Sequence, residues 1–250
     1  MAYRHLLQSR ALIVASACAA PACAASADDA SRASRLRALL AELPPVDVAR
    51  AMRVHRVPSV LDASEVRAIV ASAERARAQL GLVQRDAHGV PTLDERATWS
   101  TYYLHTGGWL SREHPELVSK LWRAAVAADR AEGWRLLSRG EHQTGPPVTV
   151  RTAELHTVSR RGALADPRHF DGGSLVTVDV MLSERSDFVG GDLATLECDE
   201  TLMPHGPWEQ GDALIFPSHK YHCVTPVRHG LRQVLVIEVG EEKYAAGPSS

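Results

Sequence analysis

The chain has little cysteine and no strong net charge, and both absences narrow its possible functions. Of four cysteines in 250 residues, Cys18 and Cys23 fall in an unusual N-terminal segment, so only Cys198 and Cys223 remain beyond it. A disulfide between these two is possible in a secretory compartment, but two free, buried thiols are the favoured prediction. The net charge of −2 gives no reason to expect nucleic acid or an anionic membrane surface as a partner.

The chain also lacks a long, strongly apolar run, although its first 27 residues differ from the rest. They contain Arg4 and Arg10, no acidic residue, a short apolar stretch and then Ala25-Ser26-Ala27. This pattern predicts a signal peptide and a destination in the secretory pathway, either the ER lumen or outside the cell. An organelle transit peptide is the alternative, and a disordered alanine-rich tail is a third interpretation. The segment is too short and too weakly apolar to predict a stable membrane span.

The remaining sequence divides into a helical N-terminal extension over 28–53, one domain over 54–240 and a short tail over 241–250. Its first half carries helical patterns. Leucines from Leu36 to Leu43 follow helical spacing and stop at two prolines. Asp62 and Glu65 form a capping box ahead of a helix expected to reach Leu80.

Pro115 is expected in the first turn of a further helix. The apolar face of that helix is predicted to comprise Leu117, Leu121, Ala124 and Ala128.

From Val148 onward the apolar period changes from helical to two, which predicts strands. Glycine-containing turns separate the expected strands, which lie at Val148–Arg151, Leu175–Leu182, Leu193–Glu197, Asp212–Phe216, Tyr221–Val227 and Arg232–Val239. Many short strands at this spacing favour a sandwich or barrel, and a jelly roll is the best specific choice. We therefore predict a mainly β fold with helical support (α+β). Its double-stranded β-helix core, at about 148–240, would pack against N-terminal helices.

The residues that carry chemistry are His169-Phe170-Asp171, followed much later by His222 and Arg232. A spacing of two places His169 and Asp171 on the same side of an extended segment. Two imidazoles and one carboxylate are the ligands of a facial-triad iron site, which leaves coordination positions open. A lone H-x-D triplet is weak evidence, so its placement among predicted strands matters. His114-Pro115-Glu116 is a similar triplet, but it falls at a helix start, where a polar cap is the simpler explanation.

Strand alternation also predicts where His222 and Arg232 point. His222 shares a strand face with Val224, while Arg232 shares one with Val234 and Val236. Both polar side chains would therefore face the apolar interior, and a buried guanidinium is costly unless it meets an anion. A turn over 227–230 is expected to join the two strands as a hairpin. The two side chains would then face one cavity.

These stretches together resemble the 2-oxoglutarate/Fe(II) dioxygenases, and within them the prolyl 4-hydroxylase-like group. The matching motifs are confined to 168–232, and the weaker likeness extends over about 54–240. The resemblance implies that His169, Asp171 and His222 hold Fe(II), with no catalytic residue beyond these ligands. It also implies that Arg232 pairs with the distal carboxylate of 2-oxoglutarate. The implied reaction uses O2, releases succinate and CO2, and hydroxylates a substrate C–H bond, with ascorbate as a candidate reductant.

One departure from the family pattern concerns the co-substrate. Family members often carry a tyrosine in the strand before H-x-D that helps to hold 2-oxoglutarate, but here that strand reads Glu154-Leu155-His156-Thr157-Val158. Another hydroxyl would have to serve, and Thr177 is the candidate.

Two other function classes stay open at this stage. A cupin-type dioxygenase or isomerase could use the same three ligands without a keto acid, and a non-catalytic β-sandwich binding module would use no metal. The substrate is open too, because nothing in the sequence separates a peptidyl prolyl group from a small molecule. Loops at 183–189 and 198–210, and the segment 98–108, are expected to shape the entrance. Trp109 and Trp208 are candidates either for ligand contact or for packing.

Overall fold

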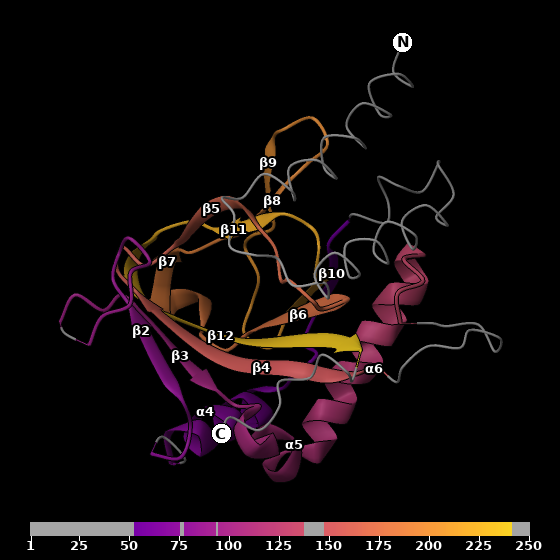
Figure 1. Cartoon of the computed structure of the whole chain (residues 1–250), viewed down its shortest axis with the longest axis horizontal. Helices are drawn as coiled ribbons and strands as arrows, with labels where there is room; N and C mark the ends of the chain where they lie inside the picture. The colour runs from indigo at the N-terminus through magenta and orange to yellow at the C-terminus, as the bar shows by residue number, and fades with distance from the viewer. Residues whose placement is uncertain (1–52, 76–77, 94, 138–147, 242–250) are drawn as a thin grey trace, which may run out of the picture.

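The computed structural model describes residues 53–75, 78–93, 95–137 and 148–241. Two facing β-sheets form the body of the molecule, and helices cover the outer face of the larger sheet (Figure 1). The expected leader over 1–27, the leucine-patterned helix before residue 44 and the tail beyond 241 lie outside the described residues. Within the described residues, no helix is both long enough and apolar enough to cross a membrane.

The larger sheet has eight strands and is antiparallel throughout. In spatial order it contains β1 (His55–Val57), β10 (Ala213–Pro217), β6 (Val176–Met181), β12 (Val227–Glu241), β4 (Val148–Ser159), β3 (Trp99–Tyr103) and β2 (Leu82–Arg85). The short strand β7 (Phe188–Gly190) pairs with the beginning of β12. The long central strands β4 and β12 thus form a curved floor that the remaining strands extend (Figure 1).

The smaller sheet lies across the interior from this floor (Figure 1). Its four strands, in spatial order, are β5 (Leu164–His169), β11 (His222–Val224), β8 (Leu193–Leu196) and β9 (Leu202–Pro204). The chain crosses repeatedly between the two sheets, because β6, β10 and β12 belong to one and β5, β8 and β11 to the other. This alternation is that of the predicted double-stranded β-helix.

Three α-helices support the larger sheet: α4 (Ala63–Arg75), α5 (Trp109–Glu113) and α6 (Pro115–Glu132), with short 3₁₀ turns η2 (Thr106–Gly108) and η3 (Arg185–Asp187). The capping box predicted for α4 forms. The amide of Asp62 donates to Glu65 at 2.8 Å, and the amide of Glu65 donates to Asp62 at 2.8 Å. Pro115 begins α6 as predicted. Both helices direct buried apolar residues toward the sheet, including Ile69 and Leu121.

The strands of the larger sheet divide their side chains between two apolar clusters. Val178 of β6 and Leu235 of β12 pack with the helices, whereas Met181 and Val234 on the same strands pack between the two sheets. Period-two alternation therefore gives each strand one face toward the helices and one toward the interior. On β6 the interior face carries polar residues as well, and these lie beside the ligand cluster described below.

Several details differ from the sequence prediction. The first half is not wholly helical, since it contributes β1, β2 and β3, and the segment 98–108 contains β3 and η2. Short strands with few apolar residues carry little periodic signal, which explains the omission. The α4 helix ends before Leu80, and Leu80 is buried in the turn that follows. Cys198 and Cys223 are free thiols, but only Cys223 is buried.

The predicted hairpin between His222 and Arg232 is also wrong. Residues 227–230, expected as its turn, are the beginning of β12, and β11 pairs with β5 and β8 in the other sheet. The interpretation failed because strands close in sequence need not pair when a connection crosses a sandwich. His222 and Arg232 nevertheless face the same interior, as predicted, but they do so from opposite sheets.

Candidate metal centre

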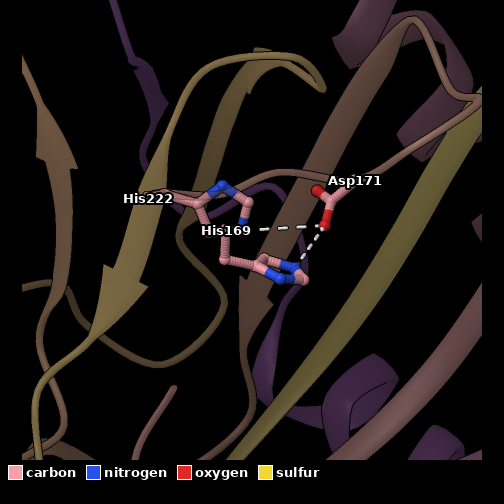
Figure 2. Close-up of side chains that lie close together, drawn as sticks. All are labelled: His169, Asp171 and His222. Carbon is pink, nitrogen blue, oxygen red and sulfur yellow. Dashed lines mark hydrogen bonds and ion pairs between the residues drawn. The ribbon is translucent and has the colours of Figure 1, made fainter. Parts of the chain in front are cut away.

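The three sequence-predicted ligands come together at one end of the interior. His169 ends β5, Asp171 lies two residues further along the chain, and His222 begins β11 in register with His169 on the neighbouring strand. One ligand atom from each residue lies within 4.8 Å of the other two. The Nε2 atom of His169 is 3.2 Å from Oδ1 of Asp171, and Nε2 of His222 is 3.7 Å from the same oxygen (Figure 2). The rings thus converge on one carboxylate oxygen.

Neighbouring groups fix two of these ligands. The Nδ1 of His222 lies 3.0 Å from the carbonyl oxygen of Lys220, so it donates there and leaves the lone pair of Nε2 directed at the cluster. The second oxygen of Asp171, Oδ2, accepts a hydrogen bond of 2.6 Å from the hydroxyl of Thr177. Ser218 lies 2.8 Å from that hydroxyl, and its carbonyl oxygen accepts from the amide of Asp171. Both residues are therefore oriented before any ion arrives.

The protonation states suit metal binding. Burial lowers the pKa of His222 despite the opposing charge of Asp171, so the imidazole is neutral at neutral pH. Burial alone would raise the pKa of Asp171, but the hydrogen bond from His169, the electrostatic influence of the nearby His222 ring and the bond from Thr177 outweigh it and lower that pKa. A carboxylate beside two imidazoles is the donor set that non-haem Fe(II) oxygenases use. The residues present therefore fit Fe(II).

Arg232 lies in the same interior, on β12. It is 2% exposed, and its Nε has no hydrogen-bond partner. Among the described residues, its guanidinium forms no hydrogen bond and no ion pair. The Cζ atom of Arg232 lies 5.5 Å from the centroid of the Trp208 ring. Burial lowers the pKa of Arg232 to about 10, so the side chain is a cation at neutral pH without a bonded anion.

A glycine makes room for this arginine. Gly191 has a left-handed φ of +68°, and a Cβ placed there would lie 2.7 Å from Cδ of Arg232. Any larger residue would combine backbone strain with a collision against the arginine stem. Gly191 thus has a physical role in positioning Arg232.

Two polar features escaped the sequence prediction. Asp179 of β6 is 7% exposed and points into the interior between the ligand cluster and Arg232. Near the cluster, Glu238 of β12 accepts hydrogen bonds from Arg151 at 2.8 Å and from Ser174 at 2.5 Å. Arg151 also donates to the carbonyl oxygen of Gly172, which ties the loop after Asp171 to β4 and β12. A period-two pattern with charged residues at interior positions was the only signal available for them.

Other sequence candidates lie elsewhere or have different partners. The hydroxyl of Thr177, predicted to contact 2-oxoglutarate, is directed to Asp171 instead, and its co-substrate contact stays a prediction. Trp109 packs in the helix-side core, and Trp208 packs between the sheets against Arg232. His114 joins α5 to α6 and contacts the Trp109 ring. His156 pairs with Glu154 on β4, whereas His205 contacts Thr195, which is in register with His222.

Comparison with known proteins supports the fold assignment. No protein-family model matches the chain, and no curated protein matches it in sequence. Among solved structures, it is similar to a prolyl hydroxylase from Trichoplax adhaerens in complex with a hypoxia inducible factor oxygen degradation domain peptide fragment. That match has 17% identity and a TM-score of 0.50, and covers 89% of this chain and 99% of that chain.

A second similar structure is SnoK, a non-heme alpha ketoglutarate dependent carbocyclase from nogalamycin biosynthesis. This match has 13% identity and a TM-score of 0.52, and covers 81% of this chain and 85% of that chain. The two proteins have different reactions but one architecture. The chain thus has the double-stranded β-helix fold of the 2-oxoglutarate/Fe(II) oxygenases.

Proposed function

We propose that the protein is a 2-oxoglutarate- and Fe(II)-dependent dioxygenase that hydroxylates a substrate C–H bond. The observation that carries this proposal is the pairing of two features in one interior: a 2-His-1-carboxylate cluster and a buried guanidinium without an anion. A buried, unpaired charge costs several kcal/mol, so a protein that keeps one has a ligand for it. A dicarboxylate keto acid supplies an anion for Arg232 and a chelating end for the metal.

The chain's own residues would divide the work as follows. His169, Asp171 and His222 would hold the metal, while Thr177 and the Lys220 carbonyl keep Asp171 and His222 in their orientations. Arg232 would bind the distal carboxylate and so fix the direction of the keto acid. When bound, Fe(II) and 2-oxoglutarate supply the oxygen chemistry, in which the keto acid and O2 yield succinate, CO2 and a hydroxylated substrate.

The apolar part of the interior excludes water from this chemistry. Phe216, Met181 and Leu193 are each fully buried between the sheets, and Phe216 stacks edge-on against His222 at a centroid distance of 5.0 Å. A water-poor environment strengthens the electrostatic contacts to bound anions and prevents loss of reactive species to solvent. The arrangement fits an oxygenase better than a passive binding module.

For the substrate, we propose a peptide, with a prolyl residue as the first group to test. Phe170 lies between two ligands in sequence, is 41% exposed, and its ring is 6.0 Å from that of Tyr221. Two rings at the edge of a metal centre offer apolar faces that suit a saturated five-membered ring. Ascorbate is proposed as the reductant that keeps iron in the ferrous state, and the secretory pathway as the location.

Succinate formation is the direct test of the reaction. Purified protein supplied with Fe(II), 2-oxoglutarate and O2 should release succinate, and a proline-containing peptide panel should show a mass gain of one oxygen. His169→Ala serves as the inactive control, and omission of ascorbate should reduce the number of turnovers. Absence of both iron binding and succinate from the wild type would overturn the proposal. Oxygen gain on small molecules but on no peptide would retain the reaction and reject the peptide substrate.

A further inference from the structure

The position of Asp179 in the interior suggests a role that the ligand cluster does not fill. On β6 it alternates with Thr177, which contacts Asp171, and with Met181, which packs between the sheets. In register, it lies opposite Val236 on β12 and Leu214 on β10. Leu214 belongs to the apolar cluster between the sheets, and Val236 packs against that cluster. A keto acid spanning from the metal ligands to Arg232 would therefore pass this carboxyl.

Asp179 and Arg232 are both buried, yet they do not bond to each other. Among the described residues, no hydrogen bond or ion pair reaches either side chain. The two groups are close enough for each to shift the pKa of the other. Buried polar groups are almost always satisfied, so the orphaned Nε of Arg232, beside an Asp179 carboxyl that forms no hydrogen bond with any described residue, indicates a missing partner that both groups could share.

The surroundings of Asp179 favour its neutral form. The charged groups that face it are Asp171, after β5, and Arg232 and Glu238, both on β12. Burial raises the pKa of Asp179 to about 8, with Asp171 adding to the rise and Arg232 opposing it. At neutral pH the side chain is thus a carboxylic acid, which has one O–H to donate.

We propose that Asp179 is the second anchor of the keto acid, donating a hydrogen bond from its neutral carboxyl to the distal carboxylate that Arg232 pairs with. This inference rests on the proposed function, and it supplies from β6 a hydrogen-bond donor in addition to Arg232. A bound dianion adds negative charge and favours the protonated acid further. An ionised Asp179 would instead repel the co-substrate.

Binding of 2-oxoglutarate to the Ni(II)-loaded protein tests the inference without relying on turnover. Isothermal titration would compare the wild type with Asp179→Asn, which keeps a donor, and Asp179→Leu, which does not. Leucine should weaken binding about 10- to 100-fold, as expected for loss of a hydrogen bond to a charged group, while asparagine should stay within about threefold. Above about pH 8 the wild type should lose affinity, whereas Asp179→Asn should not.

The control is Asp192→Asn, because Asp192 is another acid that influences the charge of Arg232. It should leave the pH dependence of binding unchanged. Equal affinity of wild type and Asp179→Leu, or tighter binding by Asp179→Asn, would overturn the role of Asp179 while leaving the proposed function intact. Failure of the wild type to bind 2-oxoglutarate at any pH would overturn both. If Asp179→Leu does not fold, the pH profile of Asp179→Asn decides.

Discussion

The two ends of the interior differ in how their charged groups are satisfied. At the metal end, Asp171 accepts from Thr177 and His222 donates to a backbone carbonyl, so the protein itself supplies the outer contacts. At the arginine end, Arg232 and Asp179 have no bonded partner among the described residues. The metal end therefore offers an ion a set of donors that the protein has already oriented. The second end lacks partners that a ligand would provide.

Removing a metal ligand should have the largest effect, because the metal end then keeps only two of its three donor side chains. His222→Ala should abolish Fe(II) binding and reduce succinate formation by more than about 100-fold. That loss exceeds the one expected when a residue that only orients a metal ligand is replaced. Iron content after gel filtration and succinate release would measure both. His205→Ala is the matched control, since His205 lies beside the same sheet without facing the cluster as a ligand. Full iron occupancy in His222→Ala would contradict the assignment.

Removing the unpaired guanidinium should affect the binding of 2-oxoglutarate without affecting the binding of iron. Arg232→Met should lower affinity for 2-oxoglutarate about 10- to 100-fold while iron content stays unchanged. Because the guanidinium is buried without a bonded anion, the ligand-free variant should unfold at the same temperature as the wild type or higher. Arg228→Met, at an exposed position on the same strand, is the control and should change neither property. Loss of iron from Arg232→Met would show that the two ends are not independent.

An outer contact of the metal end should matter less than a ligand. Thr177→Val removes the hydroxyl that donates to Asp171 but keeps the side-chain shape. Fe(II) affinity should fall about 10- to 100-fold, and Thr177→Ser should restore most of it. Competition with a chelator would give the affinities. If Thr177→Val instead weakens 2-oxoglutarate binding with normal iron affinity, the co-substrate contact predicted from sequence is the correct role.

The contrast between the ends also marks what the sequence could reveal. The sequence was enough to predict the three metal ligands, because local spacing and strand alternation place His169, Asp171 and His222. Arg232 was readable from the apolar residues that alternate with it, although the predicted hairpin was wrong and its strand pairs elsewhere. Asp179 was not identified, because strand alternation gave only the face on which it lies. Its significance depends on β6 lying beside β12, a pairing between segments far apart in the sequence. The strands β1 to β3 were missed because they are short and contain few apolar residues, so they carry little periodic signal.

The glycine beside Arg232 should have a smaller effect, felt through the arginine's position. Gly191→Ala adds a Cβ that would lie 2.7 Å from Cδ of Arg232, in addition to a left-handed backbone. Gly89→Ala is matched for backbone strain, since Gly89 has a φ of +75° and nothing within 4 Å of a Cβ. Both should lose about 1 kcal/mol of stability. Only Gly191→Ala should raise the KM for 2-oxoglutarate several-fold. Equal KM values for the two variants would show that Gly191 does not position Arg232.

The smallest expected effect on turnover, that of Asp179→Asn, should still be visible in the pH dependence of stability. The carboxyl of Asp179 has a pKa of about 8 in the folded protein and about 3.8 when unfolded. Between these values the folded state keeps a proton that the unfolded chain has lost, so the free energy of unfolding falls as pH rises. The stabilisation is complete below about pH 4 and gone above about pH 8. Urea unfolding of the ligand-free protein at pH values across this window should therefore show a steeper decline for the wild type than for Asp179→Asn. Parallel curves would mean that Asp179 is ionised in the folded protein, and that the arginine end already holds a balanced pair of charges.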